Sequence, residues 1–146
     1  MGNAELVLRQ VTIGDYQQIT EIHRALGEDS ESEYWRKKLD IYTTDPELCI
    51  GVESEGKLVG YMLGHLKGGE FGVTDEIGWI EMMAVHPGWQ NRGVGRMMVE
   101  TLFKVLRGRG CTRVFILCSW RHAAVLTFLD EIGFNRGDLI HLEMAL

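Results

Sequence analysis

A short glycine-containing segment in the middle of the chain joins two regular patterns and limits how both can be arranged. Residues 90–95 read QNRGVG. They follow an apolar run at residues 77–85, which predicts a strand, and lead into residues 94–106, where apolar side chains recur at helical spacing. The first N–H groups of a helix lack partners inside the helix, and the helix dipole adds positive potential there. A strand, a loop and a helix start in this order predict an anion-binding site.

The residues of this segment suit a bulky phosphorylated ligand. Gly93 and Gly95 have no Cβ, so a diphosphate can approach the backbone closely. Arg92 and Arg96 bring positive side chains to the same place. The segment lacks the Lys-Ser/Thr pair of a nucleoside-triphosphate loop and the third glycine of a dinucleotide fingerprint, which argues against both kinds of nucleotide site. From the residues alone, a plain loop with a tolerant helix start stays an alternative.

The remaining pattern predicts one α+β domain that spans residues 1–146. The chain contains no internal repeat and no linker long enough to divide it. Hydrophobic spacing and glycine or proline breaks predict strands at residues 6–11, 48–52, 58–66, 77–85, 114–118 and 139–144. They predict helices at residues 16–26, 32–41, 94–106 and 123–132, with Asp15 as a candidate cap of the first.

Composition argues against several classes of function. A formal charge of −6 disfavours general nucleic-acid binding, which relies on basic patches to neutralise phosphates. No apolar run approaches the ~20 residues of a membrane span, and the first residues hold no signal-peptide core. The three cysteines lack the spacing of a zinc site or a redox pair. We therefore expect a soluble protein of the reducing cytoplasm with no bound metal.

The glycine segment and its neighbours resemble a known family. Residues 83–95 read MAVHPGWQNRGVG and are similar to motif A of the GNAT superfamily of N-acetyltransferases, whose core is Q/R-x-x-G-x-G/A. Residues 120–134 resemble motif B of that family, a helix that ends in a Gly-Phe pair. Arg9 and Asp15 resemble its first strand and helix start, while residues 27–46 show the least resemblance.

This resemblance implies a fold and a co-substrate. The fold is a mostly antiparallel central sheet whose fourth and fifth strands splay apart, flanked by about four helices. The co-substrate is acetyl-CoA, whose pantetheine amides would pair with a strand edge as an added strand does. The predicted cofactor-binding residues are Met83, Ala84, Val85, Gln90, Asn91, Arg92, Gly93, Val94, Gly95, Arg96, His122 and Phe128.

Acyl transfer to an amine requires the neutral amine, so a base or a water relay is expected. Glu81 is the first candidate because it lies on the strand that leads into the pantetheine segment. Two alternatives remain open: the Glu81 side chain binds the substrate cation without moving a proton, or it points into solvent. Three acidic residues upstream are weaker candidates: Glu70, Asp75 and Glu76.

The general acid is not identified by the sequence. The family often places a tyrosine in the motif B helix to protonate the departing thiolate, and the matching position here is Leu129. His122 stands where the family often has an asparagine that touches pantetheine, and it would serve as a donor, as the acid or only as a surface residue. A covalent route through Cys118 lacks a readable His or Asp partner.

We expect an enzyme that moves an acetyl group to a primary amine by direct attack, the acceptor being a small molecule, a protein N-terminus or a lysine. The alternative is a catalytically weak sensor or interaction module that keeps the acyl-CoA-binding fold, which the missing tyrosine favours. Several acidic residues indicate a cationic acceptor, although an exposed helix face explains them equally well: Glu28, Asp29, Glu31 and Glu33. Dimers are common in such folds, and the sequence leaves the oligomeric state open.

Overall fold

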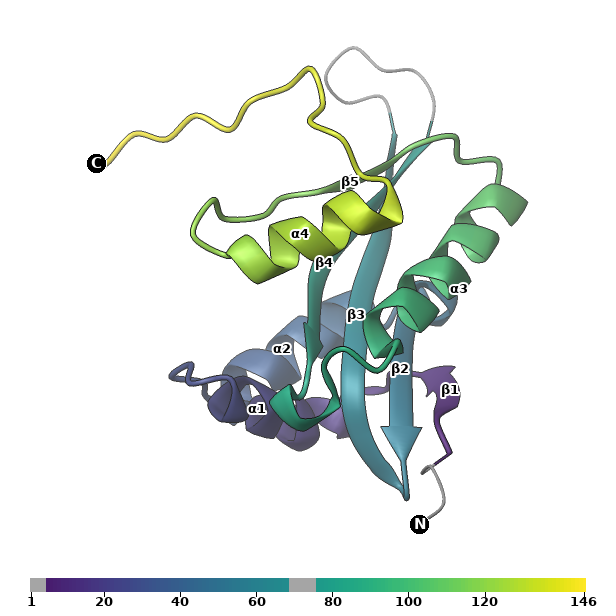
Figure 1. Cartoon of the computed structure of the whole chain (residues 1–146), viewed down its shortest axis with the longest axis vertical. Coiled ribbons are helices and arrows are strands. Elements are labelled where there is room, and N and C mark those ends of the chain that lie inside the picture. The colour runs from purple at the N-terminus through teal and green to yellow at the C-terminus, as the bar shows by residue number, and fades with distance from the viewer. Residues whose placement is uncertain (1–4, 69–75) are drawn as a thin grey trace.

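The computed structural model describes residues 5–68 and 76–146. Five strands form one sheet in the order β1-β2-β3-β4-β5 (Figure 1). Neighbouring strands are antiparallel except β4 and β5, which are parallel. The strands are β1 (Val7–Gln10), β2 (Cys49–Ser54), β3 (Lys57–Gly68), β4 (Glu76–Val85) and β5 (Val114–Ile116). The expected mixed, mostly antiparallel sheet is confirmed.

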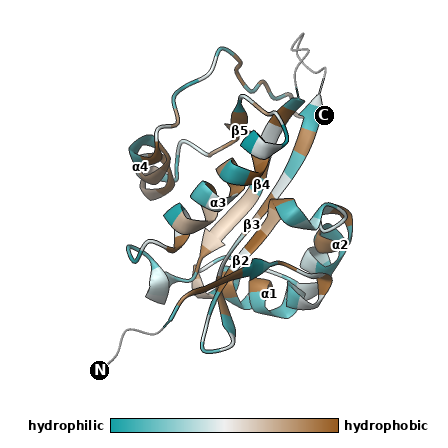
Figure 2. Ribbon diagram, turned by 90° about the vertical axis from the view of Figure 1, so that its right-hand side faces the viewer, coloured by the Kyte–Doolittle hydropathy of each residue, from teal (hydrophilic) through white to brown (hydrophobic). Residues whose placement is uncertain are grey.

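Helices cover both faces of this sheet, as Figure 2 shows. Helices α1 (Tyr16–Ala25) and α2 (Ser32–Tyr42) pack on one face. Helix α3 (Val94–Gly108) packs on the other, with α4 (Ala123–Ile132) beside it. These four helices agree with the sequence prediction within two residues at each end.

Side-chain alternation in the central strands divides the core into two clusters. Met62 of β3 points toward α3, where it meets Met98 and Leu102. The alternate positions face α1 and α2, so Tyr61 lies in the second cluster. This two-sided burial follows from the period of two in a strand, and it fixes which face each residue of β4 can present.

An ion pair joins β1 to the turn before α1. Arg9 donates two hydrogen bonds to Asp15, from Nη1 to Oδ2 and from Nη2 to Oδ1, both at 2.8 Å. The Asp15 carboxylate also accepts the backbone N–H of Thr12 at 2.8 Å. Asp15 therefore closes the short turn Ile13–Asp15. The side-chain cap of α1 that the sequence predicted is not formed, because the Asp15 oxygens already accept hydrogen bonds from Arg9 and Thr12.

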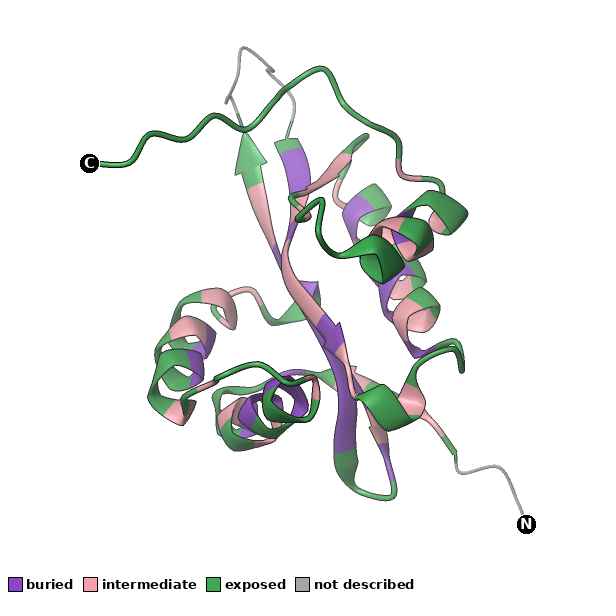
Figure 3. Ribbon diagram, turned by 60° about the vertical axis from the view of Figure 1, so that its left-hand side comes forward, coloured by how far each residue is buried: buried purple, intermediate pink, exposed green. Residues whose placement is uncertain are grey.

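The strand expected at residues 139–144 is not formed. The chain from residue 134 to residue 146 contains neither helix nor strand, and residues 135–146 are exposed (Figure 3). A strand needs a neighbour to satisfy its backbone N–H and C=O groups, and no described strand pairs with this segment. The segment therefore has the alternating pattern of a strand, but no described strand lies beside it to pair with its backbone.

Candidate functional site

Strands β4 and β5 pair over only three residues and then separate. The paired residues are Gly78 with Val114, Trp79 with Phe115, and Ile80 with Ile116. Beyond Ile80, β4 continues to Val85 with β3 on one side and no described strand on the other. The predicted splay of the fourth and fifth strands is confirmed, and it leaves residues 81–85 with an open edge.

The register of β4 decides which backbone groups face this open edge. His86 donates its backbone N–H to Val59 of β3 at 2.8 Å, and alternate residues of an antiparallel strand turn toward the same neighbour. The backbone groups of Ala84 therefore face β3, whereas those of Met83 and Val85 face the gap. The Val85 carbonyl accepts a hydrogen bond there from Gln90 Nε2 at 3.2 Å.

A bulge interrupts β4 just before this stretch. Leu63 of β3 lies opposite Met82, but the next residue, Gly64, lies opposite Ile80. Glu81 is therefore the extra residue of the bulge, with no partner across the strand pair. A bulge re-aims the side chain that it carries, and bulges are over-represented beside active sites.

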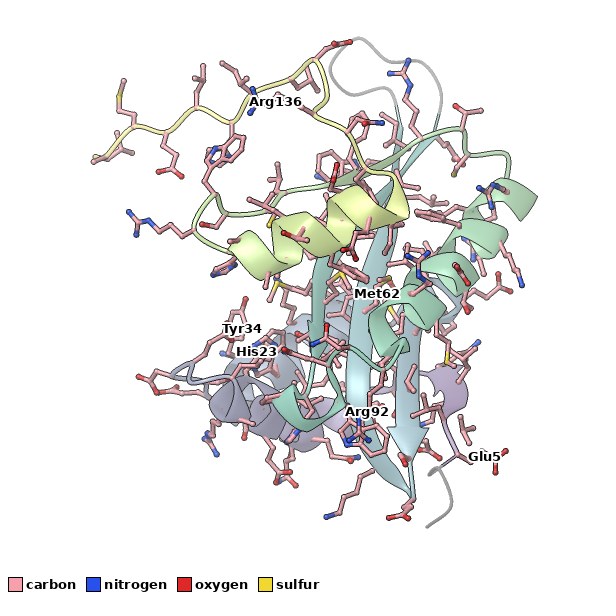
Figure 4. All side chains as sticks on the ribbon, viewed as in Figure 1. Glu5, His23, Tyr34, Met62, Arg92 and Arg136 are labelled. Carbon is pink, nitrogen blue, oxygen red and sulfur yellow. The ribbon has the colours of Figure 1, made fainter. Side chains whose placement is uncertain are left out.

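The loop after β4 turns into α3 through left-handed backbone conformations. Gly93, the residue before α3, has φ +84°, and Asn91 has φ +61°. A Cβ built on Gly93 would meet no heavy atom within 4 Å, so the approach to its backbone is open. Arg92 lies over the ring of Trp89 at 4.9 Å (Figure 4), and Arg96 lies 3.7 Å from Glu100. Both guanidinium groups are exposed beside the helix start.

Three residues of the predicted cofactor set take part in packing. Val94 is buried, and its Cγ1 lies so close to Gly60 that a Cβ there would approach it to 2.7 Å. The space beside Gly95 is filled by the ring of Phe128 from α4, whose Cζ would lie 2.9 Å from an added Cβ. At Val94 and Gly95, therefore, only the backbone N–H groups are left to contact a ligand.

Glu81 is held by an ion pair across the sheet face. Its Oε1 lies 3.2 Å from Lys38 Nζ of α2. Burial alone would raise the pKa of Glu81, but the hydrogen bond and charge of Lys38 outweigh it, so the pKa lies below its ordinary value. Burial also opposes the charge of Lys38, yet the bond to Glu81 raises the pKa of Lys38. Both groups are therefore charged at neutral pH.

A cavity of about 410 Å³ opens on the α1–α2 side of the sheet. Its wall combines carboxylates, aromatic rings and one side chain of β4: Glu28, Asp29, Glu31, Tyr34, Trp35 and Met82. Met82 directly precedes the open-edge residue Met83, so this acidic cavity reaches the strand that the cofactor would pair with. Its lining includes no residue of the α3 start. A cation fits such a wall best.

One wall residue of the acidic cavity was not singled out from the sequence. His23 is buried on α1, contacts Glu28 through Nδ1 and lies 2.6 Å from the Tyr61 hydroxyl through Nε2. Its ring stacks on Trp35 with centroids 4.5 Å apart, and Figure 4 shows His23 close to Tyr34. The available signal was its position four residues after Ile19, on the buried face of α1.

The remaining candidates lie apart from this cavity. His122 is exposed at the residue before α4, and its side chain caps no backbone group there. Cys118 follows β5, and burial raises the pKa of its thiol, which disfavours the nucleophilic thiolate. Leu129 is buried in α4. Glu76 is exposed at the opposite end of β4 from Val85, whereas Glu70 and Asp75 lie outside the described residues.

No helix within residues 5–68 and 76–146 is long and apolar enough to cross a membrane. The same residues contain no group of three or more His, Cys, Asp or Glu side chains placed to hold a metal ion.

Comparison with known proteins gives one consistent picture. The model of the acetyltransferase (GNAT) family matches residues 16–134. An acetyltransferase of Yersinia pseudotuberculosis is 29% identical over 102 residues, which are 70% of this chain and 67% of that protein.

Solved structures with the same fold are named for the acetylation of different acceptors. An aminoglycoside N-acetyltransferase in complex with CoA superposes with a TM-score of 0.82 at 12% identity, over 99% of this chain and 97% of the other. A ribosomal-protein-alanine N-acetyltransferase from Brucella melitensis gives 0.77 at 12% identity, over 97% and 100%. At such identities the likeness extends to the fold alone.

Proposed function

This chain belongs to the GNAT family of acetyltransferases, and we propose that it transfers an acetyl group from acetyl-CoA to a primary amine that is cationic. The observation that carries the proposal is the continuity of three features along β4. The acidic cavity reaches Met82, the open edge exposes backbone groups of Met83 and Val85, and the chain then runs into the free helix start at Gly93.

Acetyl-CoA would lie along this path from strand to helix. Its pantetheine amides would pair with the outward groups of Met83 and Val85, as an added strand pairs with a sheet edge. Its diphosphate would bind the N–H groups from Gly93 to Arg96, where the helix dipole favours an anion. The exposed Arg92 and Arg96 would add charge, and Asn91 would shape the turn. Ala84 would position this edge through its pairing with Tyr61.

The acetyl carbonyl would be polarised by an outward N–H group of the splayed stretch. An oxyanion formed in the transition state gains several kcal/mol from such a donor. The thiolate that leaves has an ordinary pKa near ~8.5, so it departs without a strong acid. The buried Leu129 at the position of the family tyrosine is compatible with this route, and His122 and Phe128 would contact the pantetheine side of the site.

The acceptor would enter through the acidic cavity. The carboxylates of Asp29 and Glu31 would attract a second positive charge of the substrate, while the ring of Trp35 would lie against its methylene groups or its cation. A volume of about 410 Å³ admits a short polyamine or one amino-bearing ring of a larger molecule. A polycationic amine is therefore the acceptor class that we propose.

Glu81 would take the proton of the acceptor amine through water. It is ionised at neutral pH and lies on the bulge one residue before the Met82 wall of the cavity. Its low pKa makes it a weak base, which suits a relay step more than direct abstraction. We also propose that the protein works in the reducing cytoplasm, where its thiols Cys49, Cys111 and Cys118 stay free.

The experiment is release of free thiol from acetyl-CoA in the presence of a panel of amines. The panel holds polyamines, aminoglycosides, free amino acids and peptides with free N-termini or lysines, and neutral alcohols serve as controls. We expect thiol release that depends on a polycationic amine and is absent with neutral alcohols. If acetyl-CoA raises the melting temperature but no amine releases thiol above background, the acyl-CoA sensor replaces the enzyme.

A further inference from the structure

The end of helix α1 places a carboxylate beside a buried histidine. Gly27, just after the helix, has φ +85°, the left-handed conformation that glycine favours. The chain turns back there, so that Gly27 donates its N–H to the Arg24 carbonyl and Glu28 donates to the His23 carbonyl, both at 3.0 Å. This pair of bonds is the Schellman arrangement of a helix end. It brings Glu28 back to His23, and the two side chains meet at His23 Nδ1.

The two ring nitrogens of His23 have different partners, and these partners fix where the ring proton lies. Nε2 lies 2.6 Å from the hydroxyl of Tyr61, a fully buried residue of β3. Burial raises the pKa of Tyr61 well above its ordinary value, so the phenol keeps its proton. A buried donor needs an acceptor, and His23 Nε2 lies within reach of this hydroxyl. The neutral ring therefore carries its proton on Nδ1, where it donates a hydrogen bond to Glu28.

Glu28 is thereby fixed as an anion in the wall of the acidic cavity. A neutral histidine does not cancel the charge of Glu28, and it occupies Oε2 alone, so Oε1 can accept a hydrogen bond from a ligand. The Glu28 side chain is 50% exposed. Nearby Ser30 is held as well, because its hydroxyl accepts the Trp35 Nε1–H at 2.7 Å and its carbonyl accepts from Arg24 Nε at 3.0 Å. This wall is ordered before a ligand arrives, which lowers the entropy that binding costs.

The charge of Glu28 decides which amine it can hold. A carboxylate within hydrogen-bond distance favours the charged form of an amine and so raises the pKa of that amine. Attack on acetyl-CoA requires a neutral amine, so the amine beside Glu28 is not the one that reacts. The reacting amine belongs at the open edge of β4. Tyr61 lies opposite Ala84 of β4, and both side chains lie in the core cluster on the cavity side of the sheet. The contacts from Glu28 through His23 thus end beside that edge.

We propose that Glu28 selects the acceptor by holding an ammonium group that does not react, while a second amino group of the same molecule reaches the open edge of β4. His23 is the positioning residue of Glu28. The inference rests on the acetyl transfer proposed above and narrows its acceptor to molecules with at least two amino groups. A diamine supplies the held ammonium from one end and the neutral nucleophile from the other. A monoamine held by Glu28 stays charged and does not react.

The first test compares straight-chain diamines of three to six carbons with monoamines of the same length. In wild type we expect kcat/KM to be at least about tenfold higher for the best diamine than for its monoamine. Glu28→Gln keeps the size of the side chain but removes its charge, so it should abolish this preference by raising KM for the diamine, with kcat nearly unchanged. Glu21→Gln is the matched control, because Glu21 is an exposed residue of α1 outside the cavity wall. It should keep the wild-type preference.

Two kinetic results would overturn the proposal while leaving acetyl transfer in place. One is a wild-type protein that acetylates diamines and monoamines with equal kcat/KM. The other is a preference for diamines that Glu28→Gln leaves intact. Half of the Glu28 side chain is exposed, so circular dichroism should show this variant folded.

Calorimetric titration tests the cation site without acetyl transfer. The same diamines are added to the protein with CoA in place of acetyl-CoA, so that no transfer occurs. We expect binding to wild type that weakens at least about tenfold in Glu28→Gln and stays unchanged in Glu21→Gln. This result without any acetylated product would reject the enzyme and support the cation site. Diamine binding that is absent from wild type, or equally tight in Glu28→Gln, would overturn the proposal.

The positioning role of His23 has its own measurements. Nitrogen NMR of the imidazole should show the His23 proton on Nδ1. His23→Phe removes both ring nitrogens but keeps a ring to stack on Trp35, whose centroid lies 4.5 Å from that of His23. We expect this variant to raise KM for the diamine with little change in kcat. A proton on Nε2, or an unchanged diamine KM in His23→Phe, would overturn the positioning role.

Discussion

The ring of Phe128 on α4 occupies the space that a side chain at Gly95 of α3 would fill. A Cβ added to Gly95 would lie 2.9 Å from Phe128 Cζ and 3.1 Å from Cε2. The missing side chain thus lets α4 pack against the first turn of α3, beside the helix start proposed for the diphosphate. Gly95 has two uses in this account, because its N–H would bind the cofactor while its bare Cα admits the ring.

Gly95→Ala tests that packing relationship. We expect a loss of about 1–3 kcal/mol in the free energy of unfolding, because the added methyl overpacks the contact. Weaker acetyl-CoA binding should accompany it, and combining the change with Phe128→Leu should restore part of the stability. Gly108→Ala, in the same helix, is the control because a Cβ at Gly108 would meet no heavy atom within 4 Å. Urea unfolding measures stability, and calorimetric titration measures acetyl-CoA binding. If Gly95→Ala has the same free energy of unfolding with and without Phe128→Leu, the two residues do not interact as described.

Gly93→Glu tests the diphosphate site. A carboxylate at the helix start repels an anion and blocks the open approach, so we expect acetyl-CoA affinity to fall about 100-fold or more. Gly56→Glu is a matched control because Gly56 has φ +79°, against +84° at Gly93, and both positions are open. The two variants should lose similar stability from the strained backbone, while only Gly93→Glu loses binding in calorimetric titration. Equal binding by both would remove the site from this loop.

Replacing Asp29 with Asn and Glu31 with Gln together tests the acidic cavity. Each partly solvated charge contributes about 1 kcal/mol or less, so we expect KM for a polycationic acceptor to rise about tenfold with little change in kcat. High salt should raise the wild-type KM toward that of the variant. The control is Asp40→Asn, an exposed acid of α2 outside the cavity. An unchanged KM would exclude this cavity as the acceptor entrance.

Glu81→Gln tests the proton relay. We expect kcat/KM to fall about 100-fold, at the low end of general-base effects, because the carboxylate would act through water. The pKa of Glu81 lies below its ordinary value, so Glu81 is ionised from pH 6 to 9 and the loss should be the same across that range. The wild-type rise with pH then reports the acceptor amine. Activity that stays unchanged from pH 6 to 9 would exclude Glu81 from the mechanism.

Lys38→Met tests how the ion pair with Lys38 affects the pKa of Glu81. Removing Lys38 takes away the largest interaction that opposes the effect of burial, so the pKa of Glu81 should rise. The lower limb of the pH profile of kcat/KM should then move toward neutral pH. Glu76→Gln, on the same strand and exposed, should not change the profile. A profile identical to wild type in Lys38→Met would show that this ion pair is only structural.

The Arg9–Asp15 pair gives a prediction about stability and pH. Burial would raise the pKa of Asp15, but the hydrogen bonds from Arg9 and Thr12 outweigh it and lower the pKa. A lowered folded-state pKa contributes stability that is present above the unfolded value of ~3.9 and is lost as pH falls through the folded value. Asp15→Asn should cost about 2 kcal/mol at pH 7 and much less below pH ~3. Urea unfolding at both values measures this, and a cost independent of pH would contradict it.

The sequence predicted the local parts of the site because their signals are local. The succession from β4 through Gly93 into α3 rests on neighbouring residues, and the structure has it as expected. The helices agree within two residues because their periodicity and their glycine breaks lie within the same short window. The splay of β4 and β5 followed from the family resemblance, since no local pattern reports where two strands separate.

Contacts between distant residues could not be read from the sequence. Lys38 and Glu81 are 43 positions apart, and nothing near either one indicates the other. The contact of His23 with Tyr61 was not predicted for the same reason, because the two residues are 38 positions apart. The strand predicted at residues 139–144 was wrong, because alternation within one segment does not supply the neighbouring strand with which its backbone must pair.

The most direct test of acetyl transfer is to quantify both products of one reaction. Wild-type protein with acetyl-CoA and a polycationic amine should form N-acetylated amine and free CoA in equal amounts, measured by mass spectrometry and thiol titration. Gly93→Glu should form neither, and Gly56→Glu should form both. Free CoA without acetylated amine, or acetyl-CoA binding without either product for every amine tested, would contradict the account.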